Sequence, residues 1–262
     1  MAVGMDKGSF IGLTVAISGV LFGLVLEGGK IGQILQPTAA LIVFGGTLGA
    51  VMLQFPVSVV LAAFGSLAGV FLHRSEDTSA VVAEMVGYAQ RARKEGIVSL
   101  DNELEKIEDP FLKKSLMLAV DGTEPAELRT IMELELENRL EREENLPRVF
   151  ESAGGFSPTV GIIGAVLGLI QTMQHLDNIS EVGRGIAVAF VATIYGVGSA
   201  NLFFLPVAGK IKIRQGEEQT RRQIVLEGVI SILEGMNPRM LETKLLSFVA
   251  ETQKKPVPKD VK

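Results

Sequence analysis

Four long runs without Asp, Glu, Lys or Arg dominate the hydrophobic pattern of the chain. They cover residues 8–26, 31–72, 152–174 and 185–209, and are 19, 42, 23 and 25 residues long. A helix needs about 20 apolar residues to cross the roughly 30 Å hydrocarbon layer of a bilayer. Each run reaches or nearly reaches that length, so the pattern predicts a polytopic membrane protein rather than a soluble domain.

The 42-residue run is long enough for one span or two. Pro37 lies near its start and Pro56 near its centre, after which serines, alanines and glycines dilute the hydrophobicity. We predict a single span from about Pro37 to Phe55, which continues as a helix that leaves the bilayer and runs along its cytoplasmic surface. The alternative of two spans would place residues 73–155 on the opposite side of the membrane from the amino terminus.

The remaining segments carry the periodicity of helices. Apolar residues recur every three or four positions in them, and no alternating strand pattern competes. Pro125 suits the first turn of a long helix, and we expect Pro147 to stop or bend that helix before the third span. The predicted fold is all-α, with four transmembrane helices and a helical cytoplasmic domain. The predicted parts are residues 1–72 (transmembrane helices 1 and 2 with the interfacial extension), 73–155 (the cytoplasmic helical domain), 156–209 (transmembrane helices 3 and 4) and 210–262 (a cytoplasmic helical tail with a disordered end).

Charge predicts the orientation. The net charge of −5 hides an acidic segment at 73–155, with 19 acidic and 11 basic residues, and a basic tail at 210–262, with 7 and 11. The short connections at 27–30 and 175–184 carry one Lys or Arg each, whereas five cluster just after the fourth run. The positive-inside rule therefore places both termini and the acidic segment on the cytoplasmic side of the membrane.

The side chains present argue against an enzyme. There is no cysteine, and the two histidines, His73 and His175, are about a hundred residues apart. No phosphate-binding glycine loop occurs, and the larger polar segment is acidic, which disfavours nucleic acid. We expect no catalytic residue, metal site or cofactor.

The four runs contain no ionisable acid or base, although a protein that moves ions by itself usually carries one inside the bilayer. Polar groups such as Thr193 and Tyr195 can line a wet path but cannot exchange a proton near neutral pH. If the chain serves an ion path, another chain must supply the carboxylate.

Small residues four positions apart occur in every run and let helices approach closely in lipid. Each pair has a simple explanation in packing within one chain, but their presence in all four runs favours a bundle of several chains. The sets are Gly19 and Gly23; Gly45 and Gly49; Gly164 and Gly168; and Ala192, Gly196 and Ala200.

Two prolines also stand out. Pro158 suits either the first turn of the third span or an irregularity within it, whereas Pro206 lies inside or at the inner end of the fourth, where it removes a backbone hydrogen bond. We expect both at the same depth near the cytoplasmic face, where they would form a hinge.

Six stretches in order resemble the MotA family, the channel-forming stator subunits of the bacterial flagellar motor. The resemblance covers nearly the whole chain, to about Val249. The stretches are QPTAA at 36–40, ARKEGIVSLD at 92–101, LAVDG at 118–122, SPTVGIIGAVLGLI at 157–170, AFVATIYG at 189–196, and LEG at 226–228 followed by LEG at 233–235.

The resemblance implies a ring of subunits, expected to be a pentamer, around the transmembrane helices of two MotB copies, which bring the missing aspartate. Pro158 and Pro206 match prolines near the channel, and Thr193 matches a threonine that faces the aspartate. Arg93 matches a basic residue that engages the rotor protein FliG. Asp101 stands where many relatives have Glu.

Ala165 bears on the transported ion. Sodium-driven relatives tend to carry Thr at this position, and a methyl group cannot coordinate a hard cation. We therefore expect protons, with a sodium-driven stator as an alternative. The nearest other reading is an energiser that resembles ExbB or TolQ, which usually have three spans; a non-conducting membrane scaffold is a further one.

Overall fold

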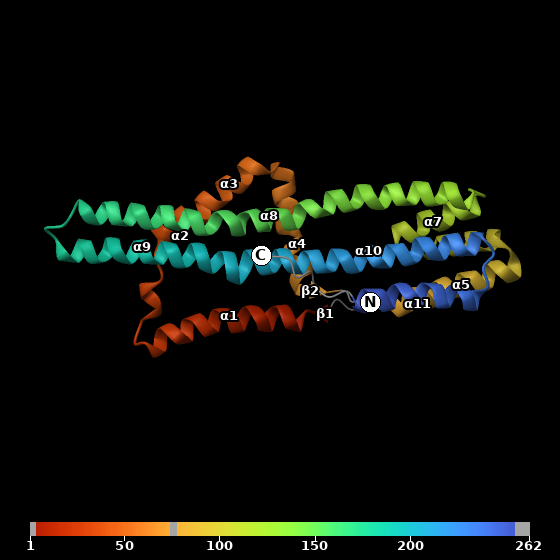
Figure 1. Ribbon diagram of the computed structural model, residues 1–262, viewed down its shortest axis with the longest axis horizontal. Coiled ribbons are helices and arrows are strands. Elements are labelled where there is room, and N and C mark those ends of the chain that lie inside the picture. The colour runs from red at the N-terminus through yellow and green to blue at the C-terminus, as the bar shows by residue number, and fades with distance from the viewer. Residues whose placement is uncertain (1–3, 74–77, 255–262) are drawn as a thin grey trace. The chain divides into compact units, whose positions relative to one another are not determined.

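The computed structural model describes residues 4–73 and 78–254 and is helical almost throughout (Figure 1). The expected disordered end at 255–262 lies outside the described residues. The chain forms two compact units, Met1–Arg74 with Glu143–Lys212, and Ser75–Arg142 with Ile213–Lys262. We call the first the membrane unit and the second the polar unit.

Four helices are long and apolar enough to cross a membrane, as predicted. The first is α1 (Lys7–Leu26), whose amino end is capped by Asp6 accepting a hydrogen bond from the Ser9 amide. The second follows the short η1 (Ile31–Gln33) and runs through α2 (Pro37–Ala40), the π-helical turn η2 (Leu41–Gly45) and α3 (Gly46–Gln54). The third lies in α8 (Pro125–Met173), and the fourth begins with α9 (Ile179–Ser199).

The 42-residue run holds one candidate span, as expected, but its continuation is a separate helix. Phe55 is extended, because the ring of Pro56 disfavours a helical conformation in the residue before it. The next helix, α4 (Val57–Phe71), has 15 residues, fewer than the roughly 20 needed to cross a bilayer. The expectation of an uninterrupted helix past Phe55 was therefore wrong.

Helix α4 packs against the third and fourth helices of the membrane unit. Its Val60, Ala63 and Val70 are buried in one apolar cluster with residues of α8 and α10, and the ring of Phe64 lies edge-on to Phe150 at 6.0 Å between centroids. The partners in the cluster are Val149, Phe150, Ala153, Val207, Ala208 and Ile211. At the end of α4, strand β2 (Leu72–His73) pairs antiparallel with β1 (Gly4–Met5). This pairing joins the start of α1 to the end of α4.

Pro147 does not stop the long helix. Helix α8 runs for 49 residues and includes both Pro147 and Pro158 in its interior, so Pro158 is not a first-turn proline either. A proline inside a helix costs about 3 kcal/mol through the lost hydrogen bond and the ring clash. Close packing of the neighbouring Val149 and Phe150 offsets that cost, since both are buried.

The fourth helix is continuous but irregular. Helix α9 passes into the π-helical turn η4 (Ala200–Phe204) and then into α10 (Leu205–Leu233), with Pro206 as the second residue of α10. A π turn changes the register of the backbone hydrogen bonds. The π turn therefore shifts the hydrogen-bond register directly before Pro206, whose nitrogen cannot donate a backbone hydrogen bond.

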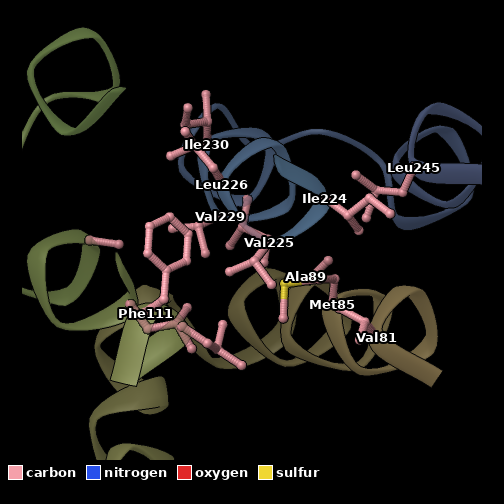
Figure 2. Close-up of a cluster of buried hydrophobic side chains, with 14 of the residues drawn as sticks. Val81, Met85, Ala89, Phe111, Ile224, Val225, Leu226, Val229, Ile230 and Leu245 are labelled. Carbon is pink, nitrogen blue, oxygen red and sulfur yellow. The ribbon is translucent and has the colours of Figure 1, made fainter. Parts of the chain in front are cut away.

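The polar unit is a helical bundle with a closed core. It comprises α5 (Thr78–Glu95), η3 (Ile97–Leu100), α6 (Asp101–Leu104), α7 (Pro110–Val120), α11 (Pro238–Lys254) and the adjoining parts of α8 and α10. Figure 2 shows Met85 of α5, Phe111 of α7, Val225 of α10 and Leu245 of α11 in one buried cluster. Gly228 is required in this cluster, because a Cβ there would lie 2.9 Å from the Met85 side chain.

Candidate functional site

The third and fourth helices meet along a seam of small residues. A Cβ on Gly161 would lie 2.9 Å from the Ala192 carbonyl oxygen, and one on Gly196 would lie 2.6 Å from the Ser157 carbonyl oxygen. Gly164 and Gly168 are equally close to α9. These small residues, Gly164, Gly168 and Gly196 among them, therefore pack within one chain, in a hairpin of α8 and α9 (Figure 1).

The small residues of the first two spans are different. A Cβ added to Gly19, Gly23, Gly45 or Gly49 would meet nothing within 4 Å. Helix α1 has no buried residue and is separated from the α8–α9 hairpin along most of its length (Figure 1). These four glycines lie on surfaces that the described part of this chain does not cover.

Two of the residues expected along the ion path, Ala165 and Thr193, lie at one level of the hairpin. Gly164 faces Ala192, with a hypothetical Cβ 2.8 Å from the Ala192 methyl group, and the next residues on the two helices are Ala165 and Thr193. Both are half-buried, and the Thr193 hydroxyl donates to the Ala189 carbonyl oxygen at 3.2 Å. That bond leaves the hydroxyl oxygen able to accept a further hydrogen bond.

Tyr195 holds the start of the second span. Its hydroxyl donates to the Ile34 carbonyl oxygen at 2.5 Å and accepts from the Gln36 amide at 3.3 Å. Its ring stacks on Phe44, with 5.9 Å between centroids. The hydroxyl is thus bonded to backbone groups beside Pro37, an anchoring role that the sequence did not indicate.

The two prolines expected near the channel, Pro158 and Pro206, do not lie at the same depth. Ser157 on α8 shares a hydrogen bond of 2.7 Å with Ser199, and Gly161 faces Gly196, so Pro158 is level with residue 198. Pro206 is eight positions further along, which at 1.5 Å per residue is about 12 Å. The expectation of a hinge formed by two prolines at one level was wrong.

Pro206 instead faces the first helix. It lines a groove of about 420 Å³ together with Gly12 and Ala16 of α1 and Lys210 of α10. Lys210 forms an ion pair of 2.7 Å with Asp6, which caps α1. The Lys210–Asp6 ion pair therefore connects the helix that contains Pro206 to the start of the first span.

Arg93 and Asp101, the expected rotor contacts, belong to the polar unit. Arg93 lies in the last turn of α5, and Asp101 is the first residue of α6; both side chains are exposed. Between them, Gly96 adopts a positive φ of 83°, which a glycine tolerates and which turns the chain from α5 into η3. Among the described residues, neither side chain has a hydrogen-bond or ion-pair partner.

The sequence did not single out Glu227 as an individual site. Its carboxylate accepts from Arg129 and binds Lys244 at 2.8 Å, which joins α8, α10 and α11 of the polar unit. Burial opposes ionisation, but the hydrogen bonds from Arg129 and Lys244 outweigh it and lower the pKa of Glu227. Its place in a family-like stretch at 226–228 was the only available signal.

Within residues 4–73 and 78–254, no three His, Cys, Asp or Glu side chains gather closely enough to hold a metal ion. The chain thus contains a tightly packed α8–α9 hairpin, apolar helices that the chain itself does not cover, and a charged helical unit. Such uncovered apolar helices are suited to packing against other membrane helices.

Two family models match consecutive parts of the chain. The Motility protein A N-terminal model matches residues 10–96, and the MotA/TolQ/ExbB proton channel family matches residues 103–224. Motility protein A of Bacillus subtilis (strain 168) is 36% identical over 246 residues, which cover 94% of this chain and 91% of that relative.

Solved structures agree over the same length. The structure of C. jejuni MotAB matches with a TM-score of 0.89 and 31% identity, and covers 93% of this chain and 96% of that chain. The flagellar MotAB stator complex from Bacillus subtilis matches with a TM-score of 0.86 and 35% identity, over 95% and 98%. The chain therefore belongs to the MotA family of flagellar stator subunits, a family of multi-pass inner-membrane channel subunits rather than of enzymes.

Proposed function

We propose that this chain forms an ion channel with a MotB partner and converts ion flow into torque on the rotor protein FliG. The observation that carries the proposal is the absence of any ionisable residue from the four charge-free runs. A conducting path through such helices needs a carboxylate from elsewhere. A MotB helix with an intramembrane aspartate would supply it, beside the level of Ala165 and Thr193.

The uncovered surfaces support a ring of several copies, expected to be a pentamer. Helix α1 has no buried residue, and a Cβ added to Gly19, Gly23, Gly45 or Gly49 would meet nothing within 4 Å among the described residues. Part of this surface suits lipid, and the small residues suit the close approach of another helix. The hairpin of α8 and α9, which is already closed within the chain, would keep its shape while neighbouring subunits assemble.

We infer that the transported ion is a proton. Ala165 presents a methyl group at the level of Thr193, so this position offers no oxygen to replace the hydration shell of Na⁺. Protonation of the partner's aspartate would remove a costly charge from the bilayer and let the surrounding helices move past it. A sodium-driven stator remains the alternative that ion replacement tests.

The polar unit would carry the force, with both chain termini and this unit in the cytoplasm. Basic residues crowd the end of the fourth charge-free run, as the positive-inside rule requires for a cytoplasmic end. Arg93 and Asp101 are exposed and without partners among the described residues, so they are available to charged groups of FliG. Such contacts set orientation and partner choice more than raw affinity.

The test is a gene deletion in the host, with flagella counted by electron microscopy and swimming recorded. We expect paralysed cells with normal flagella, rescued by the wild-type gene and poorly by Pro158→Ala. Swimming speed should then follow the proton gradient and not external sodium. Normal swimming with a defect in envelope transport would contradict the proposal and favour a function like that of ExbB or TolQ.

A further inference from the structure

A small apolar cavity lies beside Arg93 in the polar unit. Its volume is about 200 Å³, and it lies where the end of α5 meets the end of α10. Its lining residues are Ala89, Ala92, Arg93, Ile97, Ile232, Leu233, Gly235 and Met236.

The cavity exists because small residues stand where two helices end. Ala89 and Ala92 present only methyl groups from α5, and Gly235, with a φ of 71°, ends the α10 segment without a side chain. Ala89 and Ile232 are buried and form the floor, whereas Ala92, Ile97 and Met236 are half-buried at the rim. The cavity is therefore built from packed core residues and opens to the outside at its rim.

Its size and charge limit what it can hold. A small-molecule site usually occupies roughly 300–1,000 Å³, so this cavity suits a single side chain better than a cofactor. Arg93 is the only charged residue that lines it, and no described residue pairs with Arg93. An exposed guanidinium at the edge of an apolar cavity recognises an apolar group that has a carboxylate beside it.

We propose that this cavity is an anchoring pocket for the rotor partner: it receives one large apolar side chain of a protein helix that also presents a carboxylate to Arg93. The inference rests on the proposed function and refines it, because it adds a desolvated apolar anchor to the exposed charge contact. Exposed ion pairs alone contribute little, whereas buried apolar anchors carry much of the energy of an interface.

The experiment uses the whole stator complex, with its MotB partner, in lipid nanodiscs, and purified FliG as the probe. Ala92→Leu fills the cavity, and Ala83→Leu is the matched control, because Ala83 is exposed on the same helix and does not line the cavity. Met236→Ala enlarges the cavity instead of filling it, so it does not crowd the fold. Complex assembly and proton influx in vesicles verify that each variant is intact.

We expect Ala92→Leu to weaken FliG binding by about tenfold or more, since the side chain that the cavity would receive loses its burial. Met236→Ala should weaken binding less, because it removes apolar contacts with that side chain but leaves the cavity open. Ala83→Leu should bind like the wild type. The loss in the two pocket variants should persist at high salt, whereas the loss in Arg93→Ala should shrink there, because salt screens exposed charges and does not weaken apolar burial.

Loss of the pocket contact and loss of the whole rotor contact give different results. If FliG binds the wild type and Arg93→Ala weakens it, but both pocket variants bind normally, the pocket inference is overturned and the proposed rotor contact stands. If FliG does not bind the wild-type complex, the rotor contact and the pocket fall together.

Discussion

Large apolar side chains of the polar unit are covered by one another, whereas those of the membrane unit mostly are not. Among the residues whose exposure the structure describes, only six exposed large hydrophobic residues lie in the polar unit, namely Val98, Met117, Leu134, Ile213, Met240 and Leu246. In the membrane unit, no residue of α1 is buried, and most of its large apolar side chains are exposed. Each unit is thus built for a different solvent. The membrane unit is closed chiefly at the α8–α9 seam and in the apolar cluster that α4 forms with α8 and α10.

The sharpest test of this comparison is at the seam, where we expect the largest effect. Gly196→Val should nearly abolish accumulation of the chain in the membrane, because its Cβ would overlap the Ser157 carbonyl oxygen and Gly161 Cα, which are backbone atoms that cannot rotate away. Gly198→Val, two positions along, should accumulate normally, since nothing lies within 4 Å. Immunoblots of membrane fractions measure both.

Equal accumulation of the two glycine variants would mean that the seam does not hold the hairpin. If Gly198→Val accumulates but fails to restore swimming, its face is needed for assembly with another chain. That outcome would sharpen the difference between surfaces closed within the chain and surfaces left for partners.

The next largest effect is expected in the core of the polar unit. Leu245 is fully buried on α11, so Leu245→Ala should lower the free energy of unfolding of this unit by about 2–5 kcal/mol through lost burial and a residual cavity. Its neighbour Leu246 is 45% exposed, and Leu246→Ala should cost about 0.5 kcal/mol or less. Protease release of α11 from the purified chain compares the two.

The hydrophobic pattern predicted the spans well but could not predict how the prolines act. Charges are excluded from spans by the bilayer itself, so the charge-free runs closely match α1 and the apolar parts of the other three. Whether a proline breaks a helix depends on its neighbours in space: Pro56 ends one, while Pro147 and Pro158 lie inside α8.

The sequence predicted which residues belong to the candidate site but not how they are arranged in space. Small residues four apart look alike in all four runs, yet only those of α8 and α9 meet one another. Spacing within a helix reveals which residues share a face, and it does not reveal what that face touches. The same limit hid the ion cluster at Glu227, whose partners are 98 and 17 positions away in the chain.

That ion cluster gives a smaller and pH-dependent effect. Glu227→Gln should lower the stability of the polar unit at pH 7 by about 1–3 kcal/mol, because Arg129 and Lys244 lose a charged partner. The folded-state pKa of Glu227 lies below its ordinary value of 4.5, so its contribution is complete above that pH and is lost as the pH falls through the folded-state pKa.

Thermal melts of the wild type and Glu227→Gln should therefore differ at pH 7 and begin to converge as the pH falls below 4.5, the ordinary pKa of this carboxyl group. Glu234→Gln is the control, since Glu234 is exposed near the end of the same helix. A difference between wild type and Glu227→Gln that grew with acidification would contradict the ion-cluster assignment.

Substitution of Tyr195 gives the smallest expected effect. It distinguishes residues that pack within this chain from residues that line the ion path. Tyr195→Phe keeps the stacking on Phe44 and removes the hydroxyl that bonds to the Ile34 carbonyl and the Gln36 amide. If that hydroxyl only anchors the start of the second span, stability should fall by about 1 kcal/mol and proton influx through the assembled complex should stay unchanged. If it also lines the ion path, as the sequence suggested, influx should fall while a matched variant at the neighbouring contact, Phe44→Leu, loses stability alone. Measuring both quantities on both variants therefore decides whether Tyr195 belongs to the closed packing of this chain or to the conducting surface that it shares with its partner.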